Sequence, residues 1–138
     1  MNNLYEQDFY QWTIEQANLL KAGALSQLDI ENLIEEIESM GKSQKKELFS
    51  RMAVLLMHLL KWDYQTVHRS GSWKSTILTQ RRELKFLLND NPSLKKLIPD
   101  VVVSVYHDSR LSAAAETGLP ESAFPESCPY TSEQIMGE

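Results

Sequence analysis

The sequence predicts an all-α protein, an antiparallel bundle of about five helices with an extended, proline-containing C-terminal tail packed on it. Apolar residues recur at the three- and four-residue spacing of helices, and the two-residue alternation of strands is almost absent. Glycine, proline, serine and aspartate separate these apolar runs, as they do at helix ends. The chain has 138 residues, a common size for one domain, so we expect a single domain over residues 1–138.

The first two helices are expected over residues 8–22 and 29–40. Gly23 and Gly41 follow them as C-terminal stops, and Asp29 is a favourable N-cap for the second helix. Helical spacing predicts that the second helix buries one apolar face, made of Ile30, Leu33, Ile34, Ile37 and Met40.

The third helix, over residues 43–65, carries the longest apolar run of the chain. Advancing 100° per residue gathers its core residues on one face, Leu48, Met52, Leu55, Leu56 and Leu59. A loop follows at 67–72, and Ser72 is expected to cap a fourth helix over residues 73–88. The apolar face of that helix comprises Trp73, Ile77, Leu84, Leu87 and Leu88.

The fifth helix is expected from Pro99 to Thr117, with Gly118 as its stop. Residues 119–138 contain three prolines and should be extended, with a last helical turn at 132–136. Phe124 and Tyr130 would hold this tail against the bundle.

Composition excludes several classes of protein. The apolar run from Ala53 to Leu60 is far shorter than the roughly 20 residues of a membrane span, so we expect no membrane partner. The N-terminus lacks a basic start and an apolar signal core, so export is not expected. A single cysteine, Cys128, excludes an internal disulfide and fits the cytoplasm.

Charge is unevenly distributed around a net value of −5. Residues 61–96 carry eight bases and three acids, whereas residues 1–47 carry nine acids and four bases. A basic segment can bind nucleic acid through phosphate contacts. In a chain that is acidic as a whole, pairing of basic with acidic helices is the simpler interpretation.

Polar residues gather on one face of the third helix beside its core. Residues of the fourth and fifth helices would meet them, and together they form a candidate polar pocket: Arg51, His58, Lys61, Gln65, Gln80, Arg81, Tyr106 and Glu116. Gln80 lies within an apolar face and needs hydrogen-bond partners, and Glu116 would seek a base such as Arg81, Arg110 or Lys61. The pocket either binds a ligand or is a hydrogen-bonded network that fixes helix register, and we favour the closed network.

No motif of strong catalytic specificity is present, so we assign no catalytic residue, metal ligand or cofactor. The three histidines do not form the four-residue His/Glu spacing of helical metal sites. Cys128 lies in a proline-rich tail with no neighbouring base. Arg51 and His58 loosely resemble the Arg–His spacing of dimeric helical ribonucleases, in which Arg steadies phosphate charge and His moves a proton.

Seven segments resemble the bacterial domain-of-unknown-function family 29 in the expected order. They are YEQDFYQW, LDIENLIEEIESMG, HLLKW, SWKSTILTQRREL, NPSLKKL, ETGLP and FPESCPY, which together extend over nearly the whole chain. The resemblance implies a small, all-helical bacterial protein. It implies no reaction, because the family has none assigned.

The leading hypothesis is therefore a non-enzymatic, cytoplasmic helical domain that binds another protein or a second copy of itself. Tyr10, Ile14 and Phe86 are candidate contacts on the remaining helix faces. The alternative is a nucleic-acid-binding or RNA-processing protein that uses residues 61–96 and the pair of Arg51 and His58.

Overall fold

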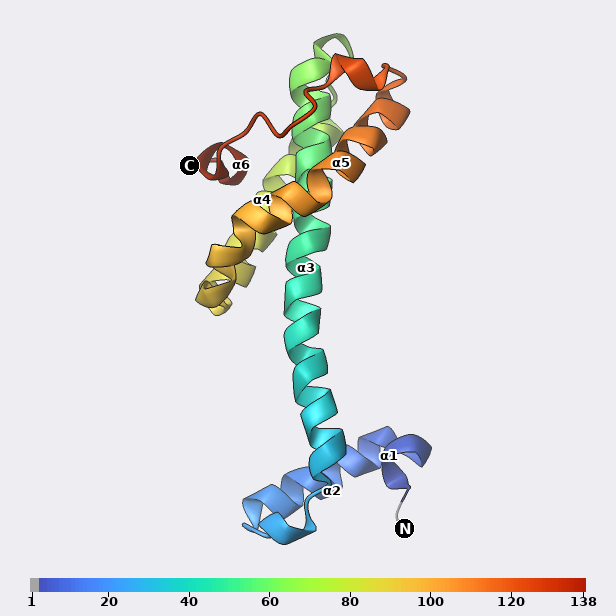
Figure 1. Ribbon diagram of the computed structural model, residues 1–138, viewed down its shortest axis with the longest axis vertical. Coiled ribbons are helices and arrows are strands. Elements are labelled where there is room, and N and C mark those ends of the chain that lie inside the picture. The colour runs from blue at the N-terminus through green and yellow to red at the C-terminus, as the bar shows by residue number, and fades with distance from the viewer. Residues whose placement is uncertain (1–2) are drawn as a thin grey trace. The chain divides into compact units, whose positions relative to one another are not determined.

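The computed structural model describes residues 3–138 (Figure 1). They form six α-helices, four short 3-10 helices and no strand, which confirms the all-α class. The α-helices are α1 (Leu4–Gln7), α2 (Phe9–Lys21), α3 (Ile30–Tyr64), α4 (Gly71–Asp90), α5 (Ile98–Thr117) and α6 (Ser132–Met136). The 3-10 helices are η1 (Leu25–Gln27), η2 (Thr66–His68), η3 (Pro92–Leu97) and η4 (Glu121–Ala123).

Contacts within the chain gather in two compact units, one extending to Lys42 and the other formed by Ser43–Glu138. Helix α3 contributes residues to both. The first unit also holds α1, α2 and η1, and the second holds the remaining elements. A single domain over residues 1–138 stays a prediction.

The first unit is built around Trp12 of α2. Its indole ring packs edge-on against Tyr5 at 4.8 Å between centroids and stacks on Phe9 at 5.6 Å. The indole N–H donates a 3.0 Å hydrogen bond to Oδ2 of Asp29, just before α3. Hydrogen bonds from Asn32 and Trp12 hold the pKa of the Asp29 carboxyl below its ordinary value. Trp12 thus connects α2 to the beginning of α3.

Two further contacts hold α3 within this unit. The buried Gln16 side chain accepts a 2.8 Å hydrogen bond from the backbone N–H of Asp29. The Tyr5 hydroxyl donates to the Glu36 carboxylate, and this bond, with burial, raises the pKa of Tyr5 to about 12. These polar contacts supplement a small core. Of the residues that the structure describes in this unit, two are buried, Trp12 and Gln16.

The predicted stop at Gly41 is wrong, because α3 continues through it from Ile30 to Tyr64. Gly41 does not adopt the positive φ of a glycine C-cap, whereas Gly23 and Gly118 do, as predicted, after α2 and α5. A glycine inside a helix costs about 1 kcal/mol relative to alanine. The lysines and glutamates around Gly41 are good helix formers, and the helix tolerates that cost.

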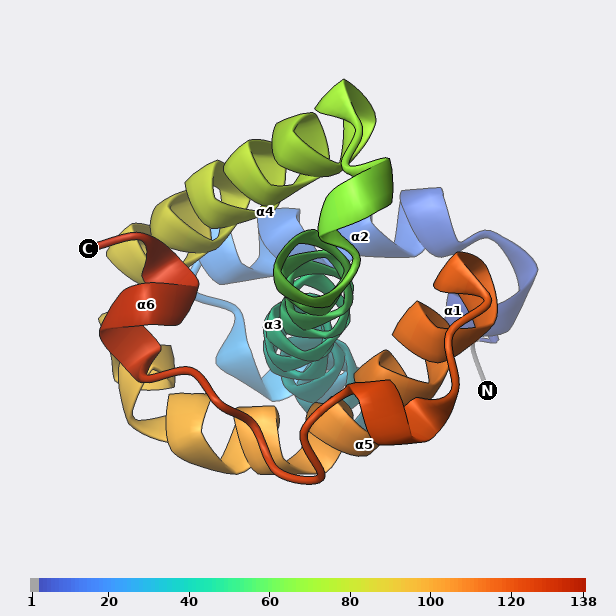
Figure 2. The ribbon, with the colours of Figure 1, turned by 90° about the horizontal axis from the view of Figure 1, so that it is seen from above.

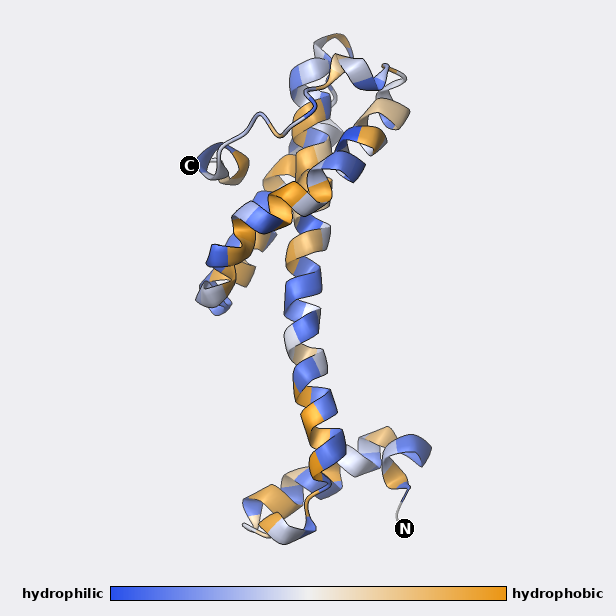
Figure 3. Ribbon diagram, in the orientation of Figure 1, coloured by the Kyte–Doolittle hydropathy of each residue, from blue (hydrophilic) through white to orange (hydrophobic). Residues whose placement is uncertain are grey.

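The predicted burial of the second helix is also wrong. Four of its apolar side chains are at least half exposed, with exposed fractions of 52% for Ile30, 51% for Ile34, 61% for Ile37 and 60% for Met40. Figure 3 shows apolar residues along this part of α3. Helical spacing places these side chains on one face but does not specify a partner to cover that face.

The second unit holds the main core. Figures 1 and 2 show α4 and α5 on different sides of the C-terminal part of α3. The predicted stripe of α3 is buried, and Leu60 joins it. The other helices and the tail complete the core with Ile77, Leu84, Leu87, Leu88, Ile98, Val101, Val102, Tyr106, Ala113, Ala114, Phe124, Ile135 and Met136.

Helix α4 begins earlier than expected. Ser70, and not Ser72, is its N-cap, and the Ser70 hydroxyl accepts a 3.3 Å hydrogen bond from the backbone N–H of Trp73. Extended backbone at Ser70 suits an N-cap, so the helix includes Gly71.

The tail packs on the second unit, as predicted. Phe124 is buried and Tyr130 is half-buried. The Tyr106 hydroxyl donates to the carbonyl of Pro125 at 2.6 Å. The expected last turn is α6, whose cap Thr131 forms a capping box with Gln134. Within residues 3–138, no helix combines the length and apolar character that crossing a bilayer requires.

Candidate functional site

Arg51 and Gln80 of the candidate polar pocket lie in contact. Nη1 of Arg51 donates to the side-chain oxygen of Gln80 at 3.2 Å, joining α3 to α4. The same guanidinium pairs with Glu47 at 2.9 Å and with Glu83 at 3.8 Å. The Gln80 oxygen therefore has the partner that its place in an apolar face requires, and two carboxylates balance the charge of Arg51.

Lys61 and Glu116 form a second pair, which joins α3 to α5. The Lys61 ammonium lies 3.3 Å from Oε2 of Glu116 and 4.8 Å from the centre of the Trp73 ring. Lys61 is buried, whereas about half of the Glu116 side chain is exposed. An ion pair and a cation–π contact thus compensate the cost of burying the ammonium.

Replacing Lys61 and replacing Glu116 should change the free energy of unfolding by different amounts. Lys61→Met keeps the apolar stem and removes the charge, so we expect the free energy of unfolding to change by less than about 1 kcal/mol. Glu116→Gln leaves a buried ammonium with a weaker acceptor. Because Glu116 is half exposed and solvent screens the pair, the expected loss is about 1 kcal/mol.

Urea denaturation of both variants measures the difference, and Glu126→Gln, an exposed tail residue, is the matched control. A Lys61→Met variant that loses several kcal/mol would show that the ammonium itself holds the helices together.

His58 and Gln65 are not joined to these pairs. Nδ1 of the half-buried His58 lies 2.9 Å from the carbonyl oxygen of Val54, one turn earlier on α3. A carbonyl only accepts, so Nδ1 carries the hydrogen in this bond. The half-buried Gln65 side chain makes no hydrogen bond to residues 3–138.

Arg81 and Tyr106 both hold the tail. Nε and Nη2 of Arg81 each donate a 2.9 Å hydrogen bond, to the carbonyls of Ile135 and Gln134. Tyr106 contacts the tail through the Pro125 carbonyl, and burial raises its pKa to about 12. Among residues 3–138, no hydrogen bond or ion pair joins Arg51, Lys61 and Arg81 into one network. A ligand site made of all eight residues stays a prediction.

Other groups offer little catalytic chemistry. Burial raises the pKa of the Cys128 thiol, which disfavours the nucleophilic thiolate. In the described residues, no three His, Cys, Asp or Glu side chains are close enough together to hold a metal ion.

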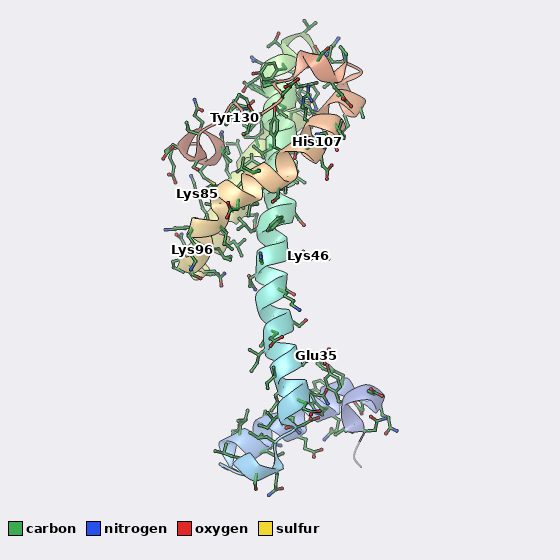
Figure 4. The ribbon with its side chains drawn as sticks, viewed as in Figure 1. Glu35, Lys46, Lys85, Lys96, His107 and Tyr130 are labelled. Atoms are coloured by element: carbon green, nitrogen blue, oxygen red, sulfur yellow. The ribbon has the colours of Figure 1, made fainter. Side chains whose placement is uncertain are left out.

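The exposed apolar residues of α3 are the feature that sequence reasoning missed. We call Ile30, Ile34, Ile37 and Met40 the α3 face. The exposed acids Glu31, Glu35 and Glu38 lie between them in the sequence (Glu35, Figure 4). No signal in the sequence distinguishes this face from a buried one, because α2 carries apolar side chains, such as Phe9, Ile14 and Leu19, that could have covered it.

The fold and these contacts define a small all-helical protein with an exposed apolar helix face on α3. The chain belongs to the family described as domain of unknown function DUF29, which matches residues 4–138. No curated protein and no solved structure matches the chain.

Proposed function

We propose that this protein is a non-enzymatic interaction domain, and that its α3 face binds an amphipathic helix of a basic partner protein. The observation that carries the proposal is the exposure of four large apolar side chains on one helix face. Apolar patches of this kind are typical of protein interfaces, because covering them removes apolar surface from water. A bacterial source and a cytoplasmic location are part of the same proposal.

Charge supports a basic partner. Glu31 and Glu38 are exposed on one flank of the α3 face, so lysine or arginine beside the apolar residues of a partner helix would be attracted to it. Antiparallel packing of two α3 faces would bring these acids together, and their negative charges would repel. Charge therefore favours a different protein over self-association through this face.

Two synthetic helical peptides test the proposal. Both carry leucine at helical spacing, and one has lysine where the other has glutamate. We expect the lysine peptide to bind the full chain and the glutamate peptide not to bind, with affinity falling as salt increases. Fluorescence anisotropy of labelled peptide measures the affinity.

The double variant Ile34→Ser/Ile37→Ser should weaken binding of the lysine peptide by about tenfold or more, because two apolar side chains no longer become buried. Val103→Ser, at a mostly exposed position of α5, is the matched control and should bind like the wild type. Equal binding of the two peptides, or a double variant that binds normally, would refute the proposal. Sedimentation of the chain without peptide tests self-association, which would give a mass that rises with protein concentration.

Nucleic-acid binding is the second candidate. Its support is the set of exposed bases on α4 and η3, Lys74, Arg82, Lys85, Lys95 and Lys96, with the exposed Phe86 on the same helix as three of them. A ribonuclease that uses Arg51 and His58 is less well supported. Arg51 is paired with Glu47 and Glu83, and the His58 ring is hydrogen-bonded to a carbonyl of its own helix. Absence of binding to short RNA or DNA at low salt would exclude this candidate.

A further inference from the structure

A hollow of about 340 Å³ lies in the second unit, lined by residues of α3, α4 and the tail. Leu59 and Ile77, both buried, supply apolar wall, and Trp62 and Tyr130 supply aromatic wall (Tyr130, Figure 4). The volume is in the range of small-molecule sites, which are mostly apolar with a few polar groups. None of the lining residues belongs to the α3 face, so a role for this hollow does not depend on the proposed function.

Two cations of α4 line the hollow, two helical turns apart. The Lys74 ammonium has no hydrogen-bond or ion-pair partner among residues 3–138. Arg81 uses Nε and Nη2 to hold two tail carbonyls, and its Nη1 donates to no described residue. Since both carbonyls are neutral, the positive charge of Arg81 is not balanced by them.

One carboxylate, Asp63, also lines the hollow, and Tyr130 engages it. The Tyr130 hydroxyl donates a 2.7 Å hydrogen bond to Oδ2 of Asp63. Burial and the neighbouring Asp63 raise the pKa of Tyr130, so the phenol keeps its proton and remains the donor. Two cations against one engaged carboxylate leave the hollow with a net positive charge.

The geometry points to a binding site for a small organic carboxylate with an aromatic or aliphatic body. The apolar body would lie against Leu59, Ile77 and Trp62, and the carboxylate would pair with the Lys74 ammonium or with the free Nη1 of Arg81. Apolar contact supplies affinity, and the charge selects an anion over a neutral or cationic molecule of the same shape.

The probe is 4-phenylbutyrate, titrated into the 15N-labelled full chain and followed by backbone amide NMR. We expect shifts in residues 59–63, 74–81 and 130–134. The neutral 4-phenylbutanol and the cationic 4-phenylbutylamine, which share the phenyl body, should bind more weakly by about fivefold or more.

Lys74→Gln should weaken phenylbutyrate binding by about threefold to tenfold, and Lys74→Arg should restore most of it. Lys96→Gln is the matched control, because Lys96 is an exposed lysine of η3 far from Tyr130 (Figure 4), and it should bind like the wild type. Thermal melts confirm that each variant is folded. The inference is overturned by an amine that binds as tightly as the carboxylate, by shifts that map elsewhere, by equal effects at Lys74 and Lys96, or by absence of shifts at millimolar phenylbutyrate.

Discussion

Leu60→Ala is expected to lower the free energy of unfolding of the second unit by about 3–4 kcal/mol. Leu60 is completely buried on α3, within the core that α4, α5 and the tail complete. Removing its branched carbons loses both the transfer free energy of those atoms and the contacts around the cavity that remains. A loss of this size is a large fraction of the stability of a typical domain.

Urea denaturation followed by NMR measures this loss, because resolved amides report each unit separately. Leu78→Ala is the matched control, with the same chemical change on α4 at a side chain that is 57% exposed. It should cost less than about 1 kcal/mol. Similar losses for the two variants would contradict the packing described for the core.

Trp12→Ala is expected to unfold α1 and α2 while leaving the second unit folded. Truncating a buried tryptophan costs about 3–5 kcal/mol, and this unit has a very small core to offset it. The indole, with an exposed fraction of 4%, also loses its hydrogen bond to Asp29 and its ring contacts with Tyr5 and Phe9.

Amide hydrogen exchange and chemical shifts measure this local unfolding. Amides of α2 should exchange freely and move to unfolded positions, whereas those of α4 and α5 should keep their shifts. Tyr10→Ala, on the same helix and 74% exposed, should leave the spectrum of the unit unchanged. Retained protection in α2 of Trp12→Ala would show that Trp12 does not hold the unit together.

Part of the candidate site could be predicted from the sequence. Helical spacing gathered Arg51 and Lys61 on one stripe, and the apolar surroundings of Gln80 required a partner for its oxygen. For Glu116, the sequence left three cations open as partners. Only the packing of α5 on α3 places Lys61 at 3.3 Å from Glu116, while Arg81 instead holds the tail. Partner choice depends on distances between helices, which no local pattern encodes.

The sequence by itself determined the all-α class, the core stripe from Leu48 to Leu59 and the last helical turn at 132–136. These features follow from periodicity and capping, which act within a few residues. Tertiary structure alone decided that Ile30 and Ile37 remain exposed. The physical reason is that an apolar helix face looks the same in sequence whether the chain itself or a partner covers it.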